Sequence, residues 1–310
     1  MKKDLRIVFM GTPEFACAGL EVLIQNNYNV VGVITAPDRK SGRGQKITPS
    51  PVKEVAVKHG LHVMQPTNLK DPEFIDELKS LNANLQIVVA FRMLPEMVWD
   101  MPEIGTFNLH ASLLPQYRGA APINWAVING ETKTGVSTFF LKHEIDTGDL
   151  LFRQEEEIKP EDNVGTLYER LMNIGADLIL KTTQKIEIGD FTTTPQQFTE
   201  ELKAAPKIFK DTCKIDWNNS SKKIHDLIRG LSPYPVAWTE LNEKTCKIYK
   251  ALLTDLPSKG EVGSFESDGK TFLHFNTGDK QLKIEELQLQ GKKRMEIGDF
   301  LRGYQLPSQN

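Results

Sequence analysis

The sequence predicts an α/β protein: a mainly parallel sheet with helices on both faces, followed by a small β domain. Leu5 to Met10 is a continuous apolar run that ends at Gly11-Thr12-Pro13. It is followed by apolar residues at helical spacing and by a second apolar run, Val30 to Thr35. A strand, a tight turn, a helix and a strand in this order are typical of a parallel sheet. Strands and helices alternate as far as residue 189, whereas short alternating runs begin after residue 207.

The first turn also bears on cofactors. It contains Gly11 alone, with neither the G-x-G-x-x-G pattern of dinucleotide sites nor the G-x-x-x-x-G-K pattern of nucleoside triphosphate sites. We therefore expect a Rossmann-like sheet without a dinucleotide.

The next elements continue the alternation. Pro51 to His59 and Asp71 to Leu81 predict helices, Leu61 to Met64 predicts a short strand between them, and Leu85 to Phe91 predicts a buried strand. Further along the chain we expect a strand over residues 150–158 and a long amphipathic helix over residues 163–186.

Polar residues gather in the segment between residues 107 and 151. In Thr106 to His110 the apolar residues alternate, so Asn108 and His110 lie on one side of a strand, opposite Phe107 and Leu109. The sequence therefore predicts that Asn108 and His110 face one pocket. Further along the segment, a short helix is expected to begin at Pro122 and to end before Asn129-Gly130.

A second strand, Thr134 to Leu141, is followed by the turn Asp146-Thr147-Gly148-Asp149. If this strand neighbours the one that carries His110, Asp146 lies beside the imidazole. An amide and an imidazole can stabilise an oxyanion on an attacked carbonyl, and a carboxylate fixes the tautomer of the imidazole. We predict Asn108, His110 and Asp146 as catalytic residues.

Other interpretations of these three residues exist. Taken singly, Asn108 or His110 is more often a structural residue. Asp146-Thr147-Gly148 could be an Asx turn, or a triplet of the aspartic-protease type, although the sequence holds no second copy of it.

Residues 36–52 break the periodicity with three Pro and two Gly. A basic loop near the end of a strand can bind phosphates, but a solvated surface loop has the same composition. Between Asp38 and Lys53 there are five basic residues and one acid, the basic ones being Arg39, Lys40, Arg43, Lys46 and Lys53.

Composition indicates a soluble globular enzyme. The chain has 310 residues, 39% hydrophobic and 25% charged, and a formal net charge of -3. Cys17, Cys213 and Cys246 are scattered, without metal-ligand spacing, so we expect neither a disulfide framework nor a metal site. No run approaches the roughly 20 apolar residues of a membrane helix. A monomer in the cytoplasm, with no membrane partner, is the expectation.

Residues 207–310 differ from the preceding residues in net charge and in sequence pattern. Residues 1–206 hold 21 Lys and Arg against 27 Asp and Glu, net -6, whereas residues 207–310 hold 17 against 14, net +3. About five short alternating runs after a helix at Lys222 to Arg229 predict a small OB-like β-barrel, and its charge suits a polyanion. We expect a catalytic domain over residues 1–189, a linker over 190–206 and a C-terminal domain over 207–310.

The ordered motifs resemble those of the 10-formyltetrahydrofolate-dependent formyltransferase superfamily. They are Asn108-x-His110, Ser112-Leu113-Leu114-Pro115, Arg118 to Ile123 and Asp146-Thr147-Gly148-Asp149. Within the superfamily the chain is most similar to the members that formylate aminoacylated initiator tRNA, because of its x-P-D-R-x-x-G-R-G loop and its C-terminal domain.

The resemblance implies formyl transfer from 10-formyltetrahydrofolate to the α-amine of methionine on initiator tRNA, without a metal. It implies that Ser112, Leu113, Leu114 and Pro115 line the folate site. In the tRNA-dependent members the basic loop enters the end of the acceptor stem, and Arg43 matches its key Arg. Arg39, Lys40 and Lys46 are the other tRNA-binding candidates.

Two other reactions use the same donor site. The acceptor could be water, as in 10-formyltetrahydrofolate hydrolases, or the amine of a sugar nucleotide. The basic loop and the C-terminal domain argue against both. Folate contacts are also expected near Phe91 to Pro95, where the sequence departs from many relatives, so no individual residue is assigned there.

Overall fold

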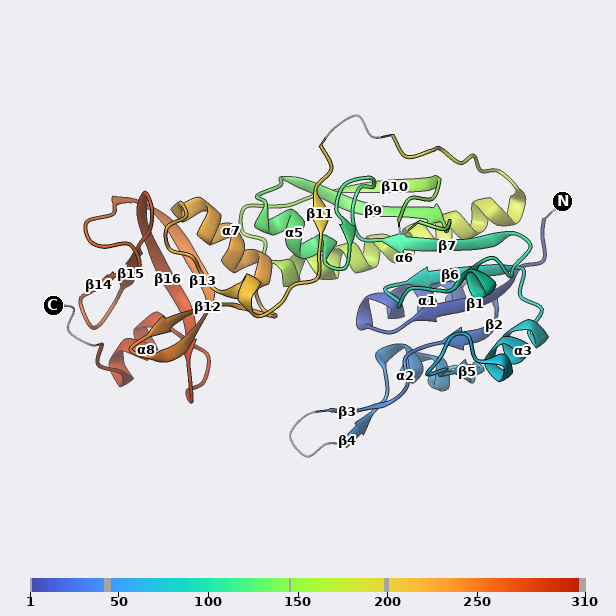
Figure 1. Cartoon of the computed structure of the whole chain (residues 1–310), viewed down its shortest axis with the longest axis horizontal. Helices are drawn as coiled ribbons and strands as arrows, with labels where there is room; N and C mark the ends of the chain where they lie inside the picture. The colour runs from blue at the N-terminus through green and yellow to red at the C-terminus, as the bar shows by residue number, and fades with distance from the viewer. Residues whose placement is uncertain (1, 42–45, 145, 198–200, 307–310) are drawn as a thin grey trace. The chain divides into compact units, whose positions relative to one another are not determined.

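The computed structural model describes residues 2–41, 46–144, 146–197 and 201–306 (Figure 1). The chain forms two compact units. The first comprises residues 1–119, 135–156 and 168–204, and the second comprises residues 120–134, 157–167 and 205–310.

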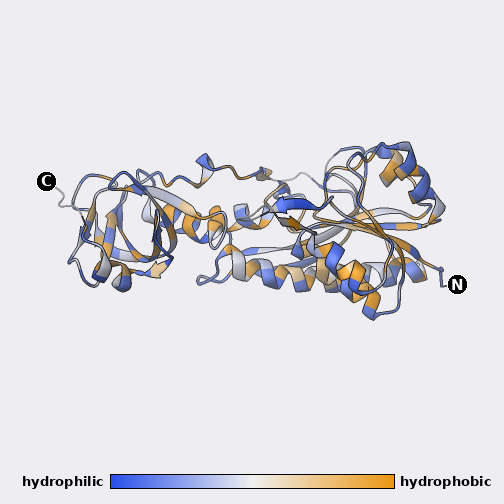
Figure 2. Cartoon of the chain, turned by 90° about the horizontal axis from the view of Figure 1, so that it is seen from below, coloured by the Kyte–Doolittle hydropathy of each residue, from blue (hydrophilic) through white to orange (hydrophobic). Residues whose placement is uncertain are grey.

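A seven-stranded sheet forms the centre of the first unit, in the order β10-β9-β7-β6-β1-β2-β5. The pairs from β5 to β7 are parallel, and β9 is antiparallel to β7. Figure 2 shows that the helices alternate between apolar and polar residues. The inner strands β1, β2 and β6 are largely apolar, whereas the second half of the edge strand β10 is polar. The strands are β1 (Arg6–Gly11), β2 (Asn29–Ile34), β5 (Val63–Met64), β6 (Leu85–Val89), β7 (Gly105–His110), β9 (Lys133–Phe140) and β10 (Leu150–Glu157).

Side-chain caps and prolines begin two of the helices in the first unit. The Ser50 hydroxyl accepts from the N–H of Lys53 and the Asp71 carboxylate from that of Glu73, each just before a proline at the first helical position. The helices are α1 (Glu14–Gln25), α2 (Pro51–Lys58), α3 (Pro72–Ser80), α4 (Glu96–Trp99) and α6 (Val164–Ile188).

The two faces of this sheet are covered by different helices. A Cβ on Gly175 of α6 would lie 2.7 Å from Leu109 Cδ2, so α6 packs closely on the face that Leu109 occupies. On the other face, Val8, Met10 and Val88 pack with the apolar side of α3 in one hydrophobic cluster. Because side chains alternate along a strand, Asn108 and His110 project away from α6.

The second unit is built on an antiparallel sheet in the order β12-β13-β16-β15-β14, with β17 beside β16. Its core includes Trp217, stacked on Phe275 at 4.4 Å, and Ile224 and Ile228 of α7. The elements are α5 (Pro122–Ile128), η1 (Asp211–Cys213), α7 (Ser221–Leu231), β12 (Ala237–Leu241), β13 (Lys244–Pro257), β14 (Phe265–Ser267), β15 (Leu273–Asn276), β16 (Lys280–Leu289), β17 (Met295–Glu296) and α8 (Ile297–Gly303).

The predicted fold class is confirmed: a mainly parallel sheet flanked by helices, and a separate antiparallel sheet. About five short strands were expected after residue 207, one of them over residues 260–265. That one is wrong for most of its length, because the chain turns there and Gly263 has φ +85°. Helices α4 and α8 were not predicted, and neither were the short strands β3 (Arg39–Ser41), β4 (Lys46–Thr48), β8 (Arg118–Gly119) and β11 (Ala204–Ala205).

A buried charge cluster on α7 leads to a stability prediction. Burial alone would raise the pKa of the Asp226 carboxyl, but the neighbouring His225 imidazole and the hydrogen bonds from Lys222 and Arg229 hold it at about 2. The folded-state pKa is below the ordinary value of 3.8, so the cluster stabilises the fold above about pH 4, and this stabilisation is lost as the pH falls to about 2.

We expect Asp226→Asn to lower the free energy of unfolding at pH 7 by about 2 kcal/mol, because it removes a paired carboxylate. The loss of stability between pH 4 and pH 2 should also be smaller in the variant. Urea unfolding at each pH measures both effects. Asp211→Asn, which changes an exposed carboxylate in the same unit, is the control. Equal unfolding curves for both variants would contradict the prediction.

Candidate active site

Asn108 and His110 lie on the face of β7 that points away from α6, as the alternation predicted. His110 is buried and Asn108 is partly buried. Within the residues that the structure describes, the Asn108 carboxamide has no hydrogen-bond partner. Its N–H groups can therefore be donated to a bound molecule.

The two ring nitrogens of His110 have different surroundings. Nε2 lies 2.9 Å from the carbonyl oxygen of Tyr117, and Nδ1 lies 3.9 Å from Oδ2 of Asp146. A carbonyl oxygen can only accept, so Nε2 carries a proton in either charge state. The other ring nitrogen, Nδ1, faces the Asp146 carboxylate.

The position of Asp146 beside His110 does not follow from the strand order alone. In the antiparallel pair, Ser137 lies opposite His110 and Phe140 lies opposite Phe107, so β9 ends at the far end of β7. The segment after β9 must return toward His110. Asp146 adopts φ +54°, a left-handed conformation that Asp tolerates better than most residues. Its Oδ2 also accepts from the N–H of Gly119 at 3.3 Å.

The candidate folate segment follows β7 directly and is fixed by β9. Ser137 Oγ donates to the Ser112 carbonyl at 2.6 Å and accepts from the N–H of Leu114 at 3.1 Å. Ser112 and Leu114 are buried, whereas Leu113 and Pro115 are partly exposed. Leu113 and Pro115 are thus the two whose side chains a folate could touch, while Ser112 and Leu114 hold the segment in place.

The basic segment forms a hairpin of β3 and β4, with Lys40 opposite Ile47. Arg39 and Lys40 are exposed on β3 and Lys46 begins β4, while Arg43 lies outside the described residues. Asp38 fixes the base of the hairpin, because its carboxylate accepts from Lys53 Nζ at 2.6 Å and from Gln65 Nε2 at 2.8 Å.

The segment after β6 lies close to this hairpin. Burial lowers the pKa of Arg92, and the positive charge of Arg39 lowers it further. Arg92 also donates to the backbone carbonyls of Pro66 and Thr67. No individual residue of this segment was predicted from the sequence.

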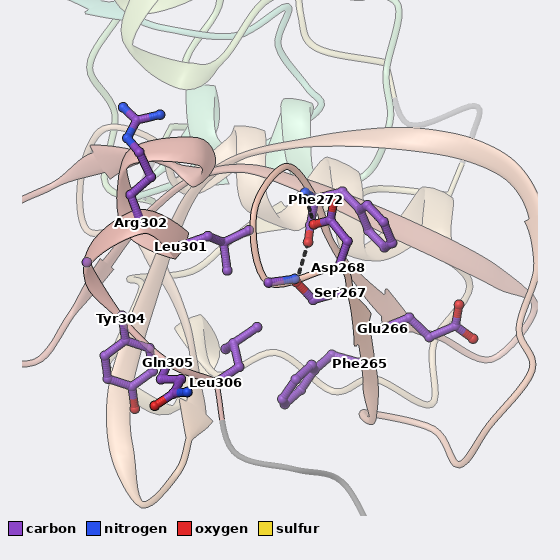
Figure 3. A pocket seen from close by; sticks show the side chains of 12 residues that line it. Phe265, Glu266, Ser267, Asp268, Phe272, Leu301, Arg302, Tyr304, Gln305 and Leu306 are labelled. Carbon is purple, nitrogen blue, oxygen red and sulfur yellow. Dashed lines mark hydrogen bonds between the residues drawn. The ribbon is translucent and has the colours of Figure 1, made fainter.

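A cavity of about 880 Å³ lies in the second unit, and it contains none of the predicted site residues (Figure 3). The Asp268 carboxylate in this cavity accepts from the backbone N–H groups of Lys270 and Thr271 and so stabilises the local turn. Among the described residues, no group of three His, Cys, Asp or Glu side chains could hold a metal ion. Nor does any helix in the described ranges have the length and apolar character needed to span a membrane.

Comparison with known proteins identifies the family. The sequence profile described as Formyl transferase matches residues 5–183, and that of its C-terminal domain matches residues 207–305. The methionyl-tRNA formyltransferase of Flavobacterium johnsoniae is 54% identical over 305 residues, which cover 97% of this chain and 96% of the relative. The chain belongs to the methionyl-tRNA formyltransferase family. A second relative, from Bacteroides fragilis, is 52% identical over 98% of this chain and 97% of its own.

Solved structures agree with the fold of this formyltransferase. A sugar 3N-formyl transferase, WlaRD, has a TM-score of 0.68 at 19% identity and covers 94% of this chain and 100% of its own. HypX from Aquifex aeolicus, in complex with tetrahydrofolic acid, has a TM-score of 0.62 at 19% identity over 97% of this chain. The formyltransferase spans about half of HypX, 48% of its length. The resemblance inferred from the motifs is confirmed at the level of the family.

Proposed function

We propose that this formyltransferase transfers the formyl group of 10-formyltetrahydrofolate to the α-amino group of methionine on initiator tRNA. The observation that carries the proposal is the arrangement at β7. His110 Nδ1 lies 3.9 Å from Asp146 Oδ2. The Asn108 carboxamide, which has no hydrogen-bond partner in the described part of the chain, is on the same face of the strand. An amide donor, an imidazolium and a carboxylate at one place suit acyl transfer between nitrogens.

Activation of the nucleophile is the smaller requirement. An α-amino group has a pKa of about 7.7–8.0 in simple models, so an appreciable fraction is neutral at pH 7. The neutral amine attacks the formyl carbon, and a new C–N bond forms. The amine nitrogen then carries a surplus proton, and the formyl oxygen carries a negative charge.

Stabilisation of that oxygen is the larger requirement. The Asn108 N–H and the Nδ1–H of protonated His110 donate to the oxyanion. Both groups are held on one strand, so little reorganisation is needed as the charge develops. Because Nε2 is bound to the Tyr117 carbonyl, the ring presents Nδ1 to the reacting group.

Asp146 supports the proton movements. Its carboxylate stabilises the imidazolium and helps to move the surplus proton of the amine to N10, either directly or through water. The bond between the formyl carbon and N10 then breaks, and tetrahydrofolate leaves with N10 protonated. No side-chain nucleophile is required.

Binding of the two substrates is assigned to different segments. We propose that the segment Ser112 to Pro115 forms the folate site, with the side chains of Leu113 and Pro115 in contact with the folate and with Ser112 and Leu114 holding the segment in place. We also propose that Arg39, Lys40, Arg43 and Lys46 bind the end of the tRNA. The net charge of +3 over residues 207–310 supports a role of this part in tRNA binding.

We propose the domain division 1–189, 190–206 and 207–310 for this two-substrate enzyme. The enzyme acts as a monomer in the cytoplasm.

One experiment separates this activity from the two related ones. The protein is incubated with 10-formyltetrahydrofolate and, in parallel, with methionyl-tRNA, with water alone or with a sugar-nucleotide amine. We expect rapid transfer to methionyl-tRNA and slow turnover in the other two reactions. Faster hydrolysis, or faster formylation of the sugar amine, would overturn the proposal.

A substitution of Arg43 tests the tRNA assignment. We expect Arg43→Ala to lower kcat/KM for methionyl-tRNA by about 10-fold or more, because it removes a phosphate contact, while binding of the formyl donor stays within about twofold. Equilibrium folate binding and steady-state transfer measure the two effects. Lys79→Ala, an exposed cation on α3, is the control. Equal losses in folate binding and in transfer would count against a tRNA role for Arg43.

A further inference from the structure

Gln196 is buried within a segment whose other described residues are exposed or partly exposed. Of the described residues between Gly189 and Ala204, it alone is buried, with 7% of its surface accessible. Its neighbours Pro195 and Gln197 are both exposed. The sequence predicts a linker here, and a linker gives no reason for a buried polar side chain. Such a side chain is found inside a protein where its hydrogen bonds are satisfied.

Both the nitrogen and the oxygen of the Gln196 carboxamide form hydrogen bonds. Nε2 donates to the backbone carbonyl of Asp146 at 2.8 Å and to that of Gly148 at 2.8 Å. Oε1 accepts from Nη2 of Arg118 at 2.5 Å. The backbone beside Gln196 is also attached, because Thr194 and Leu150 exchange hydrogen bonds of 2.8 and 2.9 Å. The segment is therefore fixed along the turn that carries Asp146.

These contacts connect Gln196 to the Asp146 turn at two points, through the backbone of the turn and through the Asp146 carboxylate. Gln196 binds the backbone of Asp146 and the side chain of Arg118, and the residue after Arg118 donates its N–H to Asp146 Oδ2 at 3.3 Å. Burial lowers the pKa of Arg118, whereas the negative charges of Asp146 and Glu144 raise it. The left-handed φ of Asp146 is a conformation that the surrounding contacts have to maintain.

We infer that Gln196 is a positioning residue for Asp146, an inference that rests on the proposed function of the site. Gln196 fixes the backbone of the turn through its hydrogen bonds to the carbonyls of Asp146 and Gly148. It also binds Arg118, and the next residue, Gly119, donates its N–H to the Asp146 carboxylate. Together these contacts hold Oδ2 3.9 Å from His110 Nδ1. Gln196 acts through Asp146.

A double-mutant cycle tests this role. Gln196→Ala and Asp146→Asn are made singly and together, and single-turnover transfer is measured with enzyme in excess. We expect Gln196→Ala to slow transfer on the order of 10-fold with Asp146 present, because a misplaced catalytic group is costly. With Asn at position 146 the same change should cost less than about twofold, since nothing remains to be positioned. KM for methionyl-tRNA should not change. Equal losses in the two backgrounds would overturn the inference.

A measurement without substrate separates this inference from the proposed function. Hydrogen exchange of the backbone over residues 142–150 should be faster in Gln196→Ala than in the native protein, and unchanged in the matched control Gln197→Ala. Unchanged exchange in Gln196→Ala would refute the positioning role, whatever the reaction. Absence of transfer by the native enzyme would instead refute the proposed function.

Discussion

Replacing His110 with Asn should lower kcat for formyl transfer on the order of 100- to 1000-fold. The imidazole is buried, and its Nε2 is bound to the Tyr117 carbonyl, so Nδ1 is the nitrogen available to the reacting oxygen. Asn is shorter and cannot carry a positive charge, so it cannot take the role that we propose for the imidazole beside Asp146. Single-turnover rates with saturating methionyl-tRNA and formyl donor measure the effect on the chemical step.

The control for this prediction is His59→Asn. His59 is exposed at the end of α2, and its replacement should leave kcat unchanged. Thermal unfolding of both variants shows whether a loss of rate comes from a loss of structure. If His110→Asn keeps its native melting temperature and more than about a tenth of the native rate, the assignment of His110 is wrong.

Gly148→Ala should abolish most of the activity through the backbone of the turn that carries Asp146. A Cβ at this position would lie 1.6 Å from the carbonyl oxygen of Phe140, an overlap that only a movement of the backbone can relieve. Gly148 is two residues after Asp146, so such a movement displaces the carboxylate. A displacement of about 1 Å can cost on the order of 100-fold in rate, and we expect at least that loss.

Steady-state transfer and thermal unfolding measure the Gly148 effect together. The matched control is Gly303→Ala, because a Cβ on Gly303 meets no atom within 4 Å and the residue lies in α8. Gly303→Ala should keep both activity and melting temperature. A Gly148→Ala variant with native activity would show that the turn tolerates another path, and that Asp146 does not depend on it.

The strand residues of the site were predictable from sequence because side chains on a strand alternate. This rule alone put Asn108 and His110 on one face, and the packing of Leu109 against α6 agrees with it. The position of Asp146 depended on an assumed strand neighbour. The two strands are neighbours, but they are antiparallel, and the path from Phe140 to Asp146 follows from tertiary hydrogen bonds that local sequence does not encode.

Two other features could not be predicted for related reasons. Gln196 lies in a segment with no apolar period, and its role depends on contacts with residues about 50 and 78 positions away in sequence. The β3–β4 hairpin has strands of three residues each, too short to produce a recognisable alternation. Helix α8 contains two glycines within seven residues, and its helix propensity is correspondingly low.

The central claim is that Asn108, His110 and Asp146 act together on the formyl group. A crystal structure of the enzyme with a non-transferable analogue of 10-formyltetrahydrofolate is the most direct measurement of it. We expect the formyl oxygen within about 3 Å of both the Asn108 carboxamide nitrogen and His110 Nδ1, with the Asp146 carboxylate still beside the imidazole. A formyl group bound elsewhere, or turned so that its oxygen meets neither donor, would contradict the account.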